Sequence, residues 1–164
     1  MSTQVEYEVH MSLAYTAEQL ARRDQSIWTK VQAILAPTQF VLFVISAYLV
    51  FQAWHTQRGY DIATLSIILK ITVLWVITIT GMIWEKEIFG HYFLAKEFYW
   101  EDVGNLVAIV THNMYFVVRY LGWSDDAIMA TMLCAYATYL INCAQFVRRG
   151  IMAGQQRRQA QRGY

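Results

Sequence analysis

Four long apolar runs constrain the fold of this chain more than any other feature of its sequence. They cover about residues 31–54, 62–84, 103–123 and 127–147. Each is longer than the roughly 20 residues that an α-helix needs to cross the hydrocarbon core of a bilayer. Because lipid offers no partner for an exposed backbone hydrogen bond, helices are the expected form of these runs. The pattern predicts an all-α, integral membrane protein with four spans.

Short connectors and a low charge content favour one compact membrane domain. His55–Asp61 and Ser124–Asp126 join the outer pairs of runs. Links this short make antiparallel neighbours, as in a four-helix bundle. Charged residues make up only 15% of the chain, whereas soluble domains average about 25%. We therefore expect 1–164 to be a single transmembrane domain. The net charge of +1 argues against a nucleic-acid partner.

The segments outside the runs predict a short helix and an orientation. The residues from Thr16 to Gln19 fit a capping box, which would open a helix over about 16–26. Most basic residues lie before the first run, between the second and third runs, or in a basic C-terminal tail at 148–164. Because cytoplasmic loops carry an excess of Lys and Arg, we expect both termini and the central loop in the cytoplasm.

The stretch from Ile83 to Asp102, between the two middle runs, is the main candidate site. It contains five of the chain's 12 acidic residues: Glu85, Glu87, Glu97, Glu101 and Asp102. Trp84, Phe89 and Trp100 lie among these acids. Such a mixture suits a site that grips a flat apolar molecule and moves protons on it. The alternative is an ordinary interfacial connector, with an aromatic belt and solvated charges.

Polar residues within the runs are costly in lipid unless they are paired or used. At 100° per residue, those of each run fall on one face of its helix. The four stripes are Gln32, Gln39 and Ser46; Lys70 and Glu85, with Gly81; Glu101, Asn105 and His112; and Thr138, Asn142, Gln145 and Arg149, with Tyr136 and Tyr139 beside them. Four stripes that face inward predict a polar cavity. The alternative is hydrogen bonding that only holds the bundle together.

Lys70 and His112 have similar predicted depths in the bilayer. Counting 1.5 Å per residue from the ends of their spans places them at nearly the same level, where they could meet or share a water. The alternatives are a lysine that snorkels to the surface and a histidine that only packs. Only His112 lies deep in a span, and no E-x-x-H motif occurs. We therefore expect neither haem nor any other metal site.

Several sequence blocks, taken in order, resemble the vinyl bacteriochlorophyllide hydratase family. They include Y-T-A-E at 15–18, V-Q-x-I-L-A-P-x-Q-F at 31–40, T-G-x-I-W-E-K-x-x-F-G at 80–90, F-x-W-E-D-V at 98–103 and A-Y-A-T-Y-x-I-N-x-A-Q-F at 135–146. The resemblance extends from about Tyr15 to Val147. It implies a multi-pass protein of bacteriochlorophyll synthesis in the inner (cytoplasmic or intracytoplasmic) membrane of a phototrophic bacterium, with other pigment-synthesis enzymes as further partners.

The reaction implied by the resemblance is the addition of water to the C3 vinyl group of a chlorophyllide-type macrocycle, giving 1-hydroxyethyl. Such a hydro-lyase needs an acid for the terminal vinyl carbon, a base for the water and an apolar slot, but no cofactor. We expect Glu101 and Asp102 to be the central catalytic pair, with Glu85 close by and His112 deeper as a base. The expected substrate-binding residues are Trp84, Lys86, Phe89, Trp100, Asn105, Lys70, Tyr139, Asn142, Gln145 and Arg149.

Two alternatives stay open at this point. Glu101 and Asp102 can instead serve as acidic caps at the start of the third span. A non-enzymatic tetrapyrrole-binding or carrier protein of the same membrane would have a similar histidine and aromatic slot. In either case, we expect the macrocycle to enter from the cytoplasmic interface between spans two and three. Lys86, Lys96 or Arg149 could meet its carboxylate there.

Overall fold

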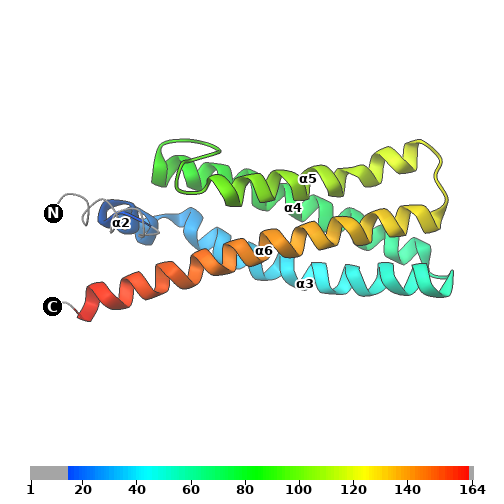
Figure 1. Ribbon diagram of the computed structural model, residues 1–164, viewed down its shortest axis with the longest axis horizontal. Helices are drawn as coiled ribbons and strands as arrows, with labels where there is room; N and C mark the ends of the chain where they lie inside the picture. Colours follow the sequence, from blue (N-terminus) through cyan, green and yellow to red (C-terminus); the bar gives the residue numbers. More distant parts are fainter. Residues whose placement is uncertain (1–14, 163–164) are drawn as a thin grey trace, which may run out of the picture.

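The computed structural model describes residues 15–162, and all regular structure in this part of the chain is helical (Figure 1). Its elements are α2 (Ala17–Gln25), α3 (Ile27–Thr56), α4 (Tyr60–Phe89), α5 (Tyr99–Tyr120) and α6 (Asp125–Arg162). The predicted all-α class is therefore confirmed. The capping box at the start of α2 is also present, because the Thr16 side chain accepts from the Gln19 backbone while the Gln19 side chain accepts from the Thr16 backbone.

The four long helices lie side by side with alternating directions (Figure 1). α3 packs along α4, α5 packs along α6, and α3 also meets α6, whereas α4 and α5 contact each other much less. The turns after α3 and α5 lie at one end of the bundle. α2, the α4–α5 connector and the last part of α6 lie together at the other end (Figure 1). At this second end, the acidic stretch therefore lies close to the N-terminal helix α2.

Three helices are long and apolar enough to cross a membrane, namely α3, α4 and the Asp125–Gln156 part of α6. α5 has 22 residues, but Asn105, His112 and Asn113 reduce its apolar character. Large apolar side chains nevertheless point outward from all four long helices, including Val44 on α3, Leu65 on α4, Val110 on α5 and Ile141 on α6. An apolar exterior of this kind is suited to contact with lipid.

Two predicted segment boundaries differ from the structure. α4 continues through the acidic stretch to Phe89 and ends at Gly90, whose left-handed backbone (φ 83°) suits a residue without a side chain. Only residues 90–98 then connect α4 to α5, so most of the predicted loop is helical. The predicted C-terminal tail continues α6 as far as Arg162. Its many Ala, Gln and Arg residues favour a helix, and Ala153 packs into a hydrophobic cluster with Tyr15.

Gly104 allows α5 and α6 to approach closely. A Cβ atom at this position would lie only 2.8 Å from Asn142 Nδ2 and closer still to Gln145 Oε1. The side chains of Asn142 and Gln145 can therefore reach across to the backbone at the start of α5. This close contact positions the first turn of α5, which carries two of the candidate acids.

Candidate active site

A half-open cavity of about 310 Å³ lies among the four long helices near the end that carries α2. Apolar side chains form most of its wall, and Tyr15 and Arg23 contribute from the N-terminal segment. Two carboxyl groups and several amides also face it. The polar lining residues include Gln32, Gln39, Thr78, Glu85, Asp102, Asn105 and Asn142. A cavity that polar residues of all four helices reach is therefore present, but its wall is mostly apolar and it occupies one end of the bundle rather than its whole length.

Glu85 and Asp102 form a buried carboxyl pair in the wall of this cavity. Their exposed fractions are only 5% and 3%, and their side chains share a hydrogen bond. The backbone N–H of Leu94 donates to Asp102 Oδ2 at 2.7 Å, and the backbone of Ala95 bonds Glu85. A hydrogen bond between two carboxyl groups requires a proton on one of them. The pair is thus an acid and a base placed side by side.

Burial favours the protonated form of Asp102, whereas the Leu94 N–H and the hydrogen bond with Glu85 favour its carboxylate form. Asp102 lies in the first turn of α5, before the apolar part of the helix begins. Burial raises the pKa of this carboxyl above its ordinary range, because a charge is poorly solvated there. Glu85 Oε2 is also buried and has no N–H or O–H donor in the described part of the chain. Neither carboxyl of the pair is matched by a cation at ion-pair distance among residues 15–162.

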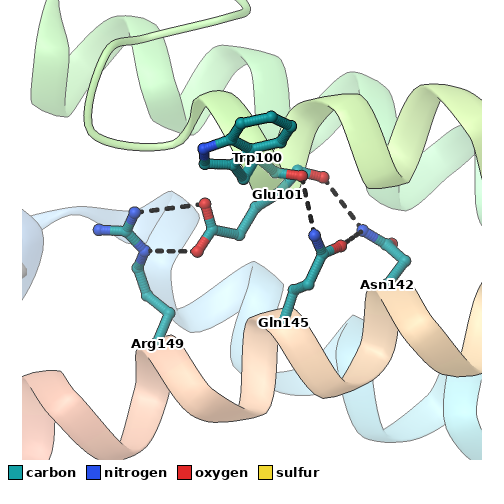
Figure 2. Close-up of polar contacts among 5 residues, drawn as sticks. All are labelled: Trp100, Glu101, Asn142, Gln145 and Arg149. Atoms are coloured by element: carbon teal, nitrogen blue, oxygen red, sulfur yellow. Dashed lines mark hydrogen bonds and ion pairs between the residues drawn. The ribbon is translucent and has the colours of Figure 1, made fainter.

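Glu101 faces a different direction from its neighbour Asp102. Its two carboxylate oxygens accept from Arg149 Nε at 2.9 Å and from a terminal nitrogen of Arg149 at 3.2 Å (Figure 2). Consecutive residues on a helix point about 100° apart, so Glu101 meets α6 while Asp102 meets Glu85. The structure therefore does not bring Glu101 and Asp102 together as the predicted central pair. Its carboxyl pair is Asp102 with Glu85.

The remaining acids of the stretch tie α2 and the start of α3 to this end of the bundle. The Ser26 hydroxyl donates to Glu87 Oε2 at 2.6 Å, and Gln19 Nε2 donates to Glu97 Oε1 at 2.7 Å. Glu87 and Glu97 each bind a polar partner outside the cavity, so both acids have a structural role. Of the five clustered acids, only Glu85 and Asp102 line the cavity.

Asn142 and Gln145 connect α6 to the start of α5. Asn142 Nδ2 donates to the backbone oxygen of Glu101 at 3.0 Å, and Gln145 Nε2 donates to that of Trp100 at 3.0 Å (Figure 2). These bonds match the alternative considered for the polar stripes, in which amides hold helices together. Asn142 also lines the cavity, as does Asn105, which bonds Thr78 across the α4–α5 gap at 3.3 Å.

Aromatic side chains build the cavity wall nearest the carboxyl pair. The Trp84 ring meets the Phe98 ring edge-on with centroids 5.3 Å apart, and Trp84 Nε1 donates to Thr29 Oγ1 at 2.8 Å. Phe89 packs behind them against both rings. The Tyr15 ring stacks on Phe89 at 5.9 Å. This cluster gives the cavity a fixed apolar surface beside its two acids.

Five of the ten predicted substrate-binding residues lie outside the cavity lining, namely Lys70, Lys86, Phe89, Trp100 and Gln145. The Trp100 side chain is 70% exposed on the outer side of α5. Lys86 Nζ donates to the backbone oxygen of Gly90 at 2.7 Å, where it helps to cap α4. The position of Trp100 and Lys86 follows from helix geometry, because each is next in sequence to a residue that points inward and so points away itself. The structure gives neither of them a role in lining the cavity.

Lys70 and His112 form a separate inner cluster, as their predicted depths suggested. Both side chains are fully buried, and both meet the rings of Tyr136 and Tyr139. Lys70 Nζ lies 3.8 Å from the Tyr139 ring centroid, and the His112 ring lies 5.5 Å from that of Tyr136. Lys70 Nζ and His112 Nε2 have no hydrogen-bond partner in the described part of the chain, whereas His112 Nδ1 lies 2.7 Å from Ala108 O.

The inner cluster is distant from the carboxyl pair. His112 follows Asp102 by about three helical turns on α5, a rise of roughly 15 Å. Neither His112 nor Lys70 lines the cavity, whereas Tyr139 lies between the two regions and lines it. The structure thus does not place His112 beside the acids that it was predicted to assist.

Sequence reasoning missed Tyr15 and Arg23 as site residues. The Arg23 guanidinium lies 5.0 Å above the Tyr15 ring, and both side chains line the cavity. Tyr15 begins the Y-T-A-E block of the family resemblance, and Arg23 lies within the extent of that resemblance, but both lie outside the apolar runs where polar stripes were sought. Their placement depends on α2 folding against the bundle. Gln39, which lay on a predicted stripe without an assigned role, also lines the cavity.

Comparison with known proteins relates the chain to one family. Residues 15–152 match the family model described as 2-vinyl bacteriochlorophyllide hydratase. A protein of that name from Rhodobacter capsulatus is 47% identical over 133 residues, which cover 81% of this chain and 78% of the relative. One from Cereibacter sphaeroides is also 47% identical over 133 residues, covering 81% and 83%. No solved structure matches the chain.

Proposed function

Because this chain belongs to the 2-vinyl bacteriochlorophyllide hydratase family, we propose that it adds water to the vinyl group of a bacteriochlorophyllide-type macrocycle. The product carries a 1-hydroxyethyl group, and the enzyme is a hydro-lyase of bacteriochlorophyll synthesis. The observation that carries the proposed chemistry is the buried Glu85–Asp102 pair in an aromatic-walled cavity.

The carboxyl pair supplies the two proton transfers that hydration needs. The protonated carboxyl gives its proton to the terminal vinyl carbon, and the electron pair of the double bond forms the new C–H bond. The positive charge is then on the inner carbon, where the conjugated macrocycle spreads it. Water attacks that carbon and loses a proton to the ionised carboxyl. One water is added in total, and no electron leaves the substrate.

The shared hydrogen bond lets the pair return to its starting state. After one turnover, the carboxyl that gave a proton is ionised and the one that accepted a proton is neutral. Transfer along the hydrogen bond between Glu85 and Asp102 restores the original arrangement without solvent. The pair would also keep an acid available near neutral pH, because two adjacent carboxyl groups resist ionising together. Such groups typically contribute a factor of about 10²–10⁴ to a rate.

The cavity wall suits the reacting edge of a planar macrocycle. Trp84 and Phe98 offer apolar surface beside the acids. A volume of about 310 Å³ is at the lower end of ligand sites. We therefore propose that the vinyl-bearing edge enters the cavity while the rest of the ring lies at its opening. The weak contact between α4 and α5 favours entry between these helices.

We also propose that α5 is a fourth span and that the α2 end of the bundle faces the cytoplasm. The outer face of α5 exposes Leu106, Val110 and Val117 to the surroundings, whereas His112 points inward. The acids and Arg119 lie near the two ends of the helix. The basic residues gathered at the α2 end favour the cytoplasmic side. The membrane would then be the inner membrane of a phototrophic bacterium.

A conversion assay tests the proposed activity. Purified protein is incubated in the dark with a vinyl bacteriochlorophyllide in isotopically labelled water. We expect a more polar, blue-shifted product that carries oxygen from the labelled water. A matched substrate whose vinyl group is reduced to ethyl should remain unchanged. Binding of the vinyl compound without any conversion would contradict the hydratase and support a carrier of the same pigment.

A further inference from the structure

The negative charge of the carboxyl pair in the cavity has no cation at ion-pair distance in the described part of the chain. Glu85 and Asp102 hold one proton between two carboxyl groups, so the pair keeps one negative charge. A chlorophyllide-type substrate brings a further carboxylate, and like charges in a poorly solvated cavity repel each other. A cation is therefore needed where the substrate's carboxylate comes to rest. Two cationic side chains line the cavity, Arg23 and Arg149.

Arg149 is already engaged by an acid of the protein. Its guanidinium binds both carboxylate oxygens of Glu101, and it lies 4.3 Å from the Phe98 ring centroid. This bidentate pair is mostly buried, with exposed side-chain fractions of 17% for Arg149 and 13% for Glu101. A carboxylate of the substrate would therefore have to compete with Glu101 for the Arg149 guanidinium. Lys86, another predicted anchor, caps α4 outside the cavity.

Arg23 has no such competitor in the described part of the chain. Its guanidinium is half-buried and rests 5.0 Å above the Tyr15 ring, with no carboxylate at ion-pair distance among residues 15–162. The neighbouring Arg22, by contrast, is exposed and pairs with Glu18 at 2.6 Å. A guanidinium has five N–H donors in a planar fork, and this geometry allows it to bind a carboxylate with two parallel bonds.

The segment that carries Arg23 is held in place by three hydrogen bonds from different parts of the chain. Gln19 is bonded to Glu97, Ser26 is bonded to Glu87, and Gln156 Nε2 donates to the backbone oxygen of Tyr15 at 2.6 Å. These contacts involve the α4–α5 connector, the end of α4 and the extension of α6. A cation fixed in advance loses less entropy when it binds a ligand.

We propose that Arg23, which lies over the Tyr15 ring, is the binding site for the free carboxylate of the macrocycle. The identity of this ligand rests on the proposed function. The site holds the carboxylate at the α2 end of the cavity while the vinyl edge meets Glu85 and Asp102. It also makes the enzyme selective for the free acid over its ester, because an ester carries no charge for Arg23 to pair with.

Binding of two matched ligands tests this site independently of turnover. The quenching of protein fluorescence is titrated with a vinyl bacteriochlorophyllide and with its methyl ester, using wild-type protein, Arg23→Gln and Arg23→Lys. The Arg22→Gln variant is the matched control, because it removes the neighbouring exposed charge. We expect Arg23→Gln to weaken binding of the free acid by about 10-fold or more, as for the loss of a charge-assisted hydrogen bond. Arg23→Lys should recover part of that loss.

The ester distinguishes an anchor from a structural arginine. Wild-type protein should bind the ester more weakly than the acid, and Arg23→Gln should leave ester binding unchanged. If wild type binds acid and ester equally, or if Arg23→Gln weakens both equally, the carboxylate site is wrong. The proposed function is judged separately: preference for the acid without any hydration would retain the site and reject the hydratase.

Discussion

Glu85, near the end of α4, shares a hydrogen bond with Asp102 in the first turn of α5, and both carboxyl groups are buried in the cavity wall. The two helices contact each other little elsewhere. This bond therefore joins them at the point where the cavity needs both an acid and a base. Glu101, which is adjacent to Asp102 in sequence, is directed to Arg149 instead.

Removing either member of the pair should abolish most of the activity. Glu85→Gln and Asp102→Asn each keep a side chain of similar shape but take away an ionisable group, and we expect kcat for vinyl hydration to fall by roughly 100-fold or more. Glu87→Gln is the matched control on the same helix, since its carboxylate bonds Ser26 outside the cavity. Near-normal rates in both folded variants would place the chemistry elsewhere.

The activity should also decline as the pH rises. Burial raises the pKa of Asp102, so the pair retains its shared proton at a pH where an ordinary carboxyl has lost it. Further increases in pH remove that proton and leave no acid for the vinyl carbon. A profile of kcat against pH should show this loss in wild type and in Glu101→Gln. A profile that stays flat into the alkaline range would contradict the shared-proton mechanism.

Glu101 should matter for stability rather than for chemistry. Glu101→Gln breaks the bidentate pair with Arg149, and we expect a loss of about 1–3 kcal/mol in the free energy of unfolding, as for hydrogen bonds to charged groups. The hydration rate of the folded variant should stay close to that of wild type. Denaturation in detergent and the hydration assay, measured on the same preparation, check both points. A large rate loss with unchanged stability would restore Glu101 as a catalytic residue.

His112 should be dispensable for proton transfer. It lies roughly 15 Å along α5 from Asp102 and is not part of the cavity lining. We expect His112→Gln to reduce the hydration rate by less than about 10-fold, well below the loss expected for a general acid or base. The comparison uses kcat of the purified variant. A loss as large as that of Glu85→Gln would mean that the inner cluster takes part in the reaction.

Single cysteines should reveal the topology. In a background with Cys134→Ser and Cys143→Ser, we place Arg58→Cys after α3, His91→Cys in the α4–α5 connector and Tyr120→Cys at the end of α5; all three positions are exposed. A membrane-impermeant thiol reagent should label 58 and 120 in intact spheroplasts and 91 only after lysis. Labelling of 120 together with 91 would show that α5 does not cross the membrane.

The apolar periodicity of the chain is sufficient to predict its helices. Runs such as 31–54 and 62–84 have to be helical in lipid, because each residue's backbone bonds must be satisfied within its own segment. Thr16 and Gln19 likewise specify the start of α2 through a purely local capping box. The ordered blocks around Trp84, Trp100 and Tyr139 are sufficient to suggest the family. The helices, the capping box and the family blocks all depend on residues that are close together in the sequence.

The residues next to each clustered acid in the sequence do not determine which of these acids line the cavity. Glu85, Glu87, Glu97, Glu101 and Asp102 are similar in sequence context, and only the packing of α4, α5, α6 and α2 assigns Glu101 to Arg149, Glu87 to Ser26 and Glu97 to Gln19. The same packing brings Arg23 to the cavity from a helix outside the apolar runs. A carboxyl group's role depends on which groups surround it in space, since burial and partner charges decide whether it holds or releases a proton.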